Sequence, residues 1–143
     1  MYHAFRLRPF GGPRARTLVK MPKCYLWDPS LVEDRAARFE NLVAGHVLKF
    51  CHFLEDTEGH RMGLYYLRDR EGREVDLLVT AAGKPWFAVE VKLSETRVDP
   101  SLRHFKAQLG IPFAYQVTLD ETRDVVDGGV RVVGASRFLG ALV

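Results

Sequence analysis

Carboxylates and a lysine recur at close spacing in the middle of the chain. Glu74 and Asp76 are followed, after a short glycine-containing segment, by Glu90 and Lys92. Carboxylate oxygens are the ligands that Mg²⁺ prefers in proteins, and a bound divalent cation polarises a phosphate and lowers the pKa of a bound water. A neighbouring lysine can orient or deprotonate that water, or stabilise developing charge. The four residues can therefore hold a divalent metal beside a scissile phosphate, with Asp76 and Glu90 as the ligands.

The spacing of these residues also predicts how their side chains meet. If residues 82–84 form the tip of a hairpin, Asp76 lies opposite Glu90, and Glu74 lies opposite Lys92. Opposed residues share a face of a sheet, and alternate residues of a strand point to the same face. One face of the hairpin is then charged. The other face is apolar and consists of Val75, Leu77, Val79, Phe87, Val89 and Val91.

The charged face needs compensation, because carboxylates directly opposite one another repel. Lys92 on the same face can neutralise Asp76 and Glu90, solvent can screen them, or a divalent cation can bind between them. A Glu-x-Lys pair alone is common in exposed strands. An upstream residue, Glu40, adds a third carboxylate if its helix packs against the hairpin. The residues alone leave these alternatives open.

The elements that position these side chains follow an α/β order. Apolar residues at three- and four-residue steps predict a helix over residues 33–54, and the glycine at position 59 ends this element. A second helix is expected from Asp99-Pro100 to Gly110, because Pro favours the first turn and Gly the end. The remaining strands are expected over residues 63–68, 74–80, 86–93, 113–119 and 130–133, with a last short helix over 137–142.

Length and composition limit the class of protein. The 143 residues fit one domain, and 47% hydrophobic residues suffice for a core. No membrane span or signal peptide is evident, so we expect a cytoplasmic protein without membrane contact. Residues 1–27 contain basic residues and no acid, although the net charge is only +3. We expect a basic extended segment over residues 1–29, followed by the main domain over residues 30–143.

The basic segment has two interpretations. Its positive charge and interleaved aromatic residues are typical of a surface that contacts a polyanion, with Arg14, Arg16 and Lys20 as the candidate nucleic-acid contacts. It is equally well explained as a solvated arm, or as a packed edge whose charge is balanced elsewhere.

The order helix, three strands, helix, strand, together with these acidic residues, resembles the PD-(D/E)xK nuclease superfamily. This resemblance implies a restriction-endonuclease-like core with a mixed central sheet flanked by helices, preceded here by an extended addition. It implies that Asp76, Glu90 and Lys92 form the catalytic site and that the helical Glu40 assists. Mg²⁺ or Mn²⁺ is the implied cofactor and DNA the preferred substrate. The residues Glu74-Val75 precede Asp76, where the superfamily motif has proline.

Several segments more narrowly resemble the domain of unknown function at the C-terminus of many AAA-type ATPases. These segments are residues 20–28, 38–43, 65–69, 73–76 and 89–92. The chain carries no phosphate-binding loop, so ATP binding is not expected, and the resemblance implies a detached form of a longer protein. It also implies an alternative function, a non-catalytic protein-interaction module that forms homodimers. A third reading is a nucleic-acid binder that does not cleave.

Overall fold

The computed structural model describes residues 4–11, 21–95 and 97–142. Three nucleic-acid candidates, Arg14, Arg16 and Lys20, lie outside these residues. The helices are α1 (Arg35–Glu58), α2 (Pro100–Leu109) and α3 (Ala135–Gly140), with a short 3-10 helix, η1 (Pro29–Leu31). The strands are β1 (Ala4–Pro9), β2 (Lys23–Leu26), β3 (Met62–Arg68), β4 (Glu74–Ala81), β5 (Lys84–Val91), β6 (Phe113–Thr118), β7 (Asp124–Asp127) and β8 (Val130–Gly134).

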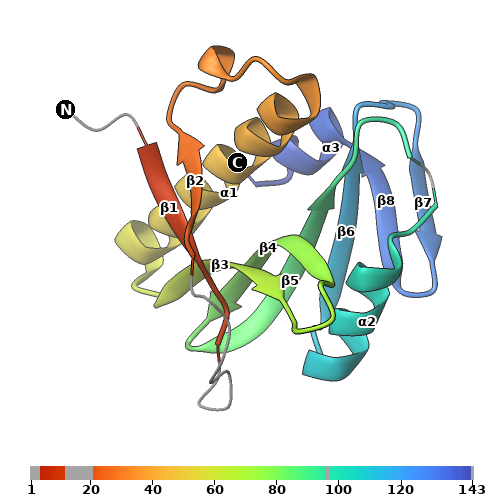
Figure 1. Cartoon of the computed structure of the whole chain (residues 1–143). Helices are drawn as coiled ribbons and strands as arrows, with labels where there is room; N and C mark the ends of the chain where they lie inside the picture. Colours follow the sequence, from red (N-terminus) through yellow and green to blue (C-terminus); the bar gives the residue numbers. More distant parts are fainter. Residues whose placement is uncertain (1–3, 12–20, 96, 143) are drawn as a thin grey trace.

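One mixed sheet organises the described part of the chain. Its strand order is β2-β1-β3-β4-β5-β6-β8-β7. The neighbours β3, β4 and β5 run antiparallel, whereas β6 is parallel to both β5 and β8. Helices α1 and α3 cover one face of the sheet, and α2 covers the other (Figure 1). The expected α/β class, the mixed sheet flanked by helices and the order helix, three strands, helix, strand are confirmed.

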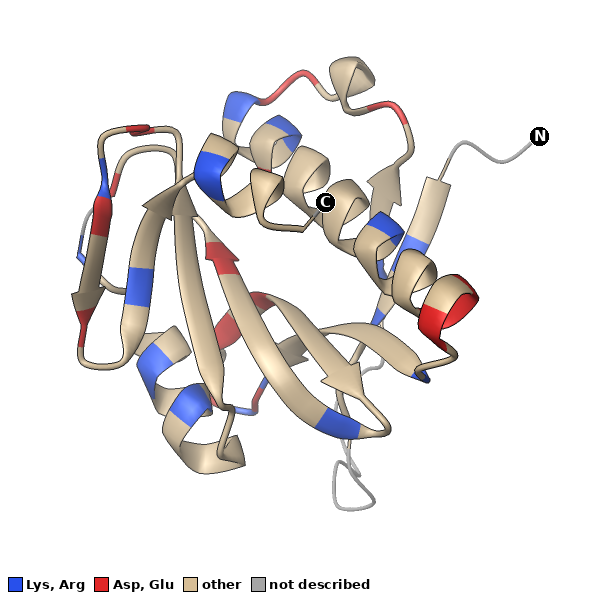
Figure 2. Cartoon of the chain, turned by 180° about the vertical axis from the view of Figure 1, so that it is seen from behind, with Lys and Arg blue, Asp and Glu red and all other residues tan. Residues whose placement is uncertain are grey.

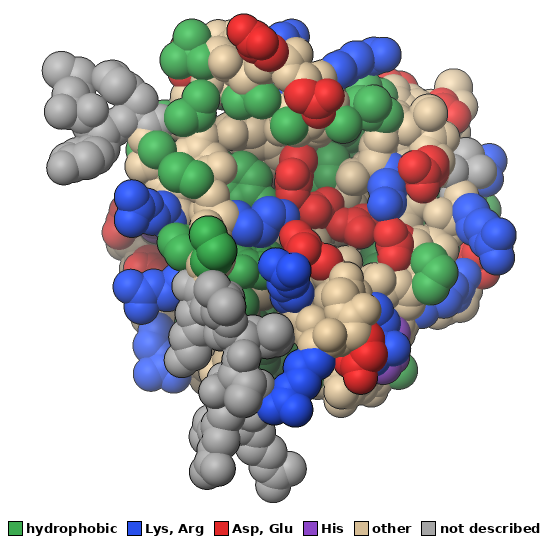
Figure 3. Space-filling model, viewed as in Figure 1, with side chains coloured by type: hydrophobic (Ala, Val, Ile, Leu, Met, Phe, Trp, Pro, Cys, Tyr) green, Lys and Arg blue, Asp and Glu red, His purple; other side chains and the backbone are tan. Residues whose placement is uncertain are grey.

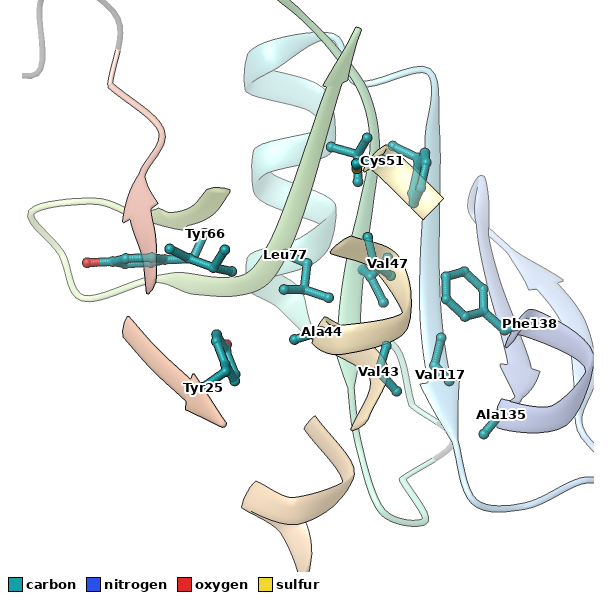
Figure 4. Packing of buried hydrophobic residues seen from close by; sticks show 14 of the residues in the cluster. Tyr25, Val43, Ala44, Val47, Cys51, Tyr66, Leu77, Val117, Ala135 and Phe138 are labelled. Carbon is teal, nitrogen blue, oxygen red and sulfur yellow. The ribbon is translucent and has the colours of Figure 1, made fainter. Parts of the chain in front are cut away.

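Helix α1 lies across one face of the sheet (Figure 2). It begins after Asp34, whose side chain accepts a hydrogen bond from the backbone N–H of Ala37, and it ends at Gly59 in the left-handed conformation. Its buried stripe includes Val43 and Val47, which have no exposed surface. Figure 4 shows these side chains packed beside the sheet. Full burial of each valine stabilises the fold by about 1.5–3 kcal/mol relative to exposure, so this stripe holds α1 in place.

The β4–β5 hairpin has the predicted register in its central part, where Leu77 pairs with Val89 and Val79 with Phe87. The turn is one residue shorter than expected. Ala81 pairs with Lys84, and Ala82 and Gly83 both have positive φ, as in a type I′ turn. A register shift next to Val79 restores the predicted pairing.

A second irregularity divides β4. Tyr65 pairs with Leu78 and Leu67 with Val75, so one residue of β3 faces two residues of β4, Asp76 and Leu77. This β-bulge changes the alternation of side chains. Val75 therefore packs with the core on the α2 side, whereas Leu77 packs on the α1 side. The expected single apolar face containing both residues is wrong.

The C-terminal part differs from expectation in one strand. Residues 124–127 form β7, an edge strand whose four residues are all exposed, so it carries no apolar alternation. The turn that follows contains Gly128 and Gly129, both with positive φ. Helix α3 begins at Ala135 rather than at residue 137. In the described part of the chain, no helix is long and apolar enough to cross a membrane.

Candidate functional site

The acidic residues gather where β4 and β5 separate. Regular pairing of the two strands ends at Leu77 and Val89, and side chains then replace the backbone ladder. The backbone N–H of Asp76 donates to Glu90 Oε1 at 3.2 Å, and the N–H of Val91 donates to Asp76 Oδ2 at 2.8 Å. The bulge in β4 places Asp76 at this point. Asp76 and Glu90 are therefore fixed relative to each other by the backbone of the neighbouring strand.

A lysine from β2 joins Asp76 to the helical carboxylate Glu40. Lys23 Nζ lies 2.9 Å from Glu40 Oε1, 3.2 Å from Glu74 Oε1 and 3.6 Å from Asp76 Oδ1. The Tyr25 hydroxyl donates to the same Glu40 oxygen at 3.1 Å. Glu40 thus reaches the hairpin, as expected from the sequence. Glu74, however, contacts Lys23 and not Lys92 as predicted, because β5 ends at Val91 and Lys92 lies beyond it.

Several contacts hold β2, and with it Lys23, against the site. The Asn41 side chain, 4% exposed, accepts a hydrogen bond from Leu26 N–H at 2.9 Å and donates to Leu26 C=O at 2.6 Å. The Lys23 ammonium also lies 5.8 and 5.5 Å from the ring centroids of Tyr25 and Tyr66. These contacts hold the Lys23 ammonium beside the carboxylates in this structure.

The second lysine, Lys92, lies on the α2 side of the site. Its ammonium is 2.9 Å from Asp99 Oδ2 and 3.9 Å from Glu90 Oε2. Asp99 is also the N-cap of α2, since its side chain accepts from Ser101 N–H at 2.8 Å. The backbone N–H of Asp99 donates to the buried Gln116 side chain at 2.9 Å. Strand β6 and helix α2 thereby position the partner of Lys92.

We call this group of seven charged side chains the acidic site; it comprises Glu40, Glu74, Asp76, Glu90, Asp99, Lys23 and Lys92. Five formal negative charges face two positive ones, which leaves three negative charges unmatched. Figure 3 shows acidic side chains gathered at the centre of this face, with basic side chains beside them. Such an excess of partly buried negative charge is unfavourable without further positive charge.

The pKa values of the carboxyl groups reflect their burial and this excess of negative charge. Burial, followed by the neighbouring Glu90 carboxylate, raises the pKa of Asp76 to about 7. Burial and the neighbouring Asp76 carboxylate raise the pKa of Glu40 to about 7. Burial also raises the pKa of Glu90. Burial opposes the charged form of Lys92, but Asp99 and Glu90 outweigh it and raise the pKa of this ammonium.

The donor set suits a hard divalent cation in chemical kind, because Glu40, Asp76 and Glu90 offer only carboxylate oxygens. Within residues 4–11, 21–95 and 97–142, however, no group of three or more Asp, Glu, His or Cys side chains converges as a metal site would. The Lys23 ammonium and two backbone N–H groups engage the oxygens that a cation would bind.

The sequence does not predict that Lys23 and Asp99 belong to the acidic site. It also does not predict Tyr25 and Gln116, which form hydrogen bonds with Glu40 and Asp99. From the sequence, Lys23 is one of several basic residues in the N-terminal segment, and Asp99 is expected only as the start of a helix. A signal for Lys23 and Tyr25 was present, since both lie in the segment 20–28 that resembles the ATPase-associated domain.

Comparison with known proteins gives a family but no characterised relative. No curated protein and no solved structure matches the chain. One family model, described as "Domain of unknown function (DUF4143)", matches residues 35–138. That range covers more than half of the 143 residues. It includes all five carboxylates and Lys92, and it begins after Lys23. The chain therefore belongs to this DUF4143 family.

Proposed function

We propose that this protein is a Mg²⁺- or Mn²⁺-dependent nuclease that hydrolyses phosphodiester bonds, with DNA as the preferred substrate. The order α1, β3, β4, β5, α2, β6 supports a fold of the restriction-endonuclease-like, PD-(D/E)xK type. The observation that carries the proposal is the position of Asp76 and Glu90 at the point where β4 and β5 separate, with Glu40 and Lys92 beside them.

Asp76 and Glu90 would hold the metal, and Glu40 would assist. When bound, such an ion polarises the scissile phosphate and lowers the pKa of the attacking water. The carboxylates need this positive charge, since the pKa of both Asp76 and Glu40 is raised to about 7. Above that pH the groups are ionised and the affinity for a cation is greatest.

Lys92 has a narrower role than the sequence allows. Its pKa is raised by Asp99 and Glu90, despite the opposing effect of burial, so the side chain is an ammonium at neutral pH. An ammonium donates hydrogen bonds and cannot accept a proton. Lys92 therefore orients the water or stabilises negative charge on phosphate oxygens, and it does not act as the general base.

Metal is also needed for substrate to approach. The acidic site carries five formal negative charges and two positive ones, so it repels a phosphate group. A divalent cation lowers the net negative charge of the site. Cleavage and DNA binding at this site are thus both expected to depend on Mg²⁺ or Mn²⁺.

The test is cleavage of plasmid and single-stranded DNA by the purified full chain at pH 8, with and without each metal. Asp76→Asn retains an acceptor for Val91 N–H but removes a ligand, and Lys92→Met removes the ammonium; each should lower the rate at least about 100-fold. Asp56→Asn and Lys84→Met alter exposed residues of the same types and should leave the rate unchanged. Metal-independent cleavage, or equal rates in all variants, would exclude this function.

A protein-interaction module is the second candidate, and one observation favours it. The edge strand β7 presents Val125 and Val126 at 44% and 69% exposure. An exposed edge strand can pair with another chain. This candidate predicts a dimer in sedimentation of the same samples, unaffected by Asp76→Asn, together with no cleavage under any metal condition.

A further inference from the structure

Lys23 lies among the carboxylates to which the proposed function assigns the metal. One ammonium contacts an oxygen of Glu40 at 2.9 Å and an oxygen of Asp76 at 3.6 Å, with Glu74 at 3.2 Å. Three carboxylate oxygens around one positive charge resemble the coordination of a metal ion. With the ammonium in place, no three of the described Asp, Glu, His or Cys side chains are arranged to hold a metal ion themselves.

The ammonium and a metal cannot share these oxygens without strong repulsion. Mg²⁺ binds carboxylate oxygens at about 2.1 Å, so an ion on Glu40 Oε1 would lie within about 5 Å of an unmoved Lys23 ammonium. Two cations at that separation in a partly buried site repel strongly. One of them has to leave the carboxylates.

We propose that Lys23 is a resident counter-cation of the acidic site and that a divalent metal displaces it from Glu40 and Asp76 when it binds. This inference rests on the proposed function. Lys23 then determines how much metal is required to assemble the site. Since β2 lies outside residues 35–138, this control belongs to a part of the chain that the family model does not cover.

The surroundings of Lys23 allow both states. Its side chain is 25% exposed, so the flexible four-carbon stem can carry the ammonium to solvent. Meanwhile β2 itself stays anchored, because Asn41 holds the backbone of Leu26 on both sides. Displacement thus requires rotation of one side chain and no rearrangement of the sheet.

The test is calorimetric titration of the full chain with MnCl₂ and MgCl₂ at pH 8. Lys23→Met removes the charge and retains most of the stem, and it should bind metal at least about tenfold more tightly than the wild type. Lys23→Arg keeps the charge and should bind like the wild type. Lys84→Met, an exposed lysine, is the matched control and should change nothing. Asp76→Asn should abolish binding.

The outcomes separate this inference from the proposed function. Metal binding by the wild type with equal or weaker binding by Lys23→Met overturns the inference and leaves the nuclease proposal intact. Absence of binding in every protein overturns both.

A second measurement does not depend on the folding of a variant. Acetylation of the wild type by an amine-reactive ester, read by mass spectrometry, should be slow at Lys23 without metal. It should become severalfold faster when Mg²⁺ is added, because the displaced amine reaches solvent, while Lys84 serves as the internal control. An unchanged rate at Lys23 under saturating metal would overturn the inference.

Discussion

Lys23 and Lys92 occupy opposite sides of the same acidic site, yet their carboxylate partners differ in protonation. The side chains of Asp76 and Asp99 have almost the same exposure, 18% and 20%. The pKa of Asp76 is nevertheless raised to about 7, whereas that of Asp99 is lowered. Similar side-chain exposure therefore accompanies opposite pKa shifts, although more of the protein surrounds the carboxyl group of Asp76 than that of Asp99.

The difference lies in how deeply each carboxyl group is surrounded by protein and in how much positive charge it receives. For Asp99, burial is outweighed by Lys92 and by the Ser101 N–H at the start of α2. For Asp76, burial is reinforced by Glu90, and Lys23 only partly offsets it because the same ammonium also serves Glu40 and Glu74. The Lys23 side of the site is short of positive charge, and a divalent cation would be most effective there.

Among the variants that test this comparison, Asp76→Asn without metal is expected to show the largest change in the free energy of unfolding. The folded pKa of Asp76 lies above its ordinary value of 3.8, so its contribution to stability is fully present below about pH 4 and is lost as pH rises to about 7. At pH 8 the wild type carries the ionised, under-compensated group. The variant should be more stable there by roughly 2 kcal/mol, and similar in stability at pH 4.

Urea unfolding at pH 4, 6 and 8 measures this effect. Addition of Mg²⁺ at pH 8 should stabilise the wild type and not Asp76→Asn. The difference in unfolding free energy between the two proteins should therefore shrink or change sign. A variant that is less stable than the wild type at pH 8 without metal would show that Lys23 already compensates Asp76 fully. The comparison between the two regions would then fail.

A smaller effect is expected on the Lys92 side. Asp99→Ala removes both the N-cap of α2 and the partner of Lys92, and should destabilise the protein by about 1 kcal/mol. Asp99→Asn retains the capping acceptor and should destabilise the protein less than Asp99→Ala does. Because the pKa of Asp99 is lowered, its charge stabilises the fold above about pH 4, and this contribution is lost as pH falls further.

Asp34→Ala is the matched control, because Asp34 caps α1 with a 2.8 Å hydrogen bond to Ala37 N–H and takes no part in the site. Both cap variants should unfold at similarly reduced urea concentrations, but only Asp99→Ala should alter metal-dependent cleavage. If Asp34→Ala and Asp99→Ala cleave DNA at the same rate, Asp99 does not support the function of Lys92.

Much of the fold follows from local signals in the sequence. The period of the apolar residues in α1, the Asp-Pro start and glycine end of α2, and the glycine-containing turn between β4 and β5 all predict their elements. The bulge at Asp76 was not predictable from alternation, because it depends on how β3 pairs with β4. Strand β7 was missed because its exposed residues show no apolar pattern.

The sequence predicts the carboxylates of the acidic site better than it predicts the lysines that contact them. Asp76, Glu90 and Lys92 lie close in the sequence, and the predicted hairpin register brings them together. Lys23 lies 17 residues before Glu40 and more than 50 before Asp76. Its role depends on the packing of β2 against α1 through Asn41, a tertiary contact that local spacing does not encode.

The most direct test of the account is a crystal structure of the full chain grown or soaked in Mn²⁺ at pH 8, with the ion located by its anomalous scattering. The account predicts an ion bound by Asp76 and Glu90, with Glu40 in reach, and the Lys23 ammonium moved away from Glu40 and Asp76. An absence of Mn²⁺ at these carboxylates under saturating metal, with Lys23 still in contact with Glu40 Oε1, would contradict it.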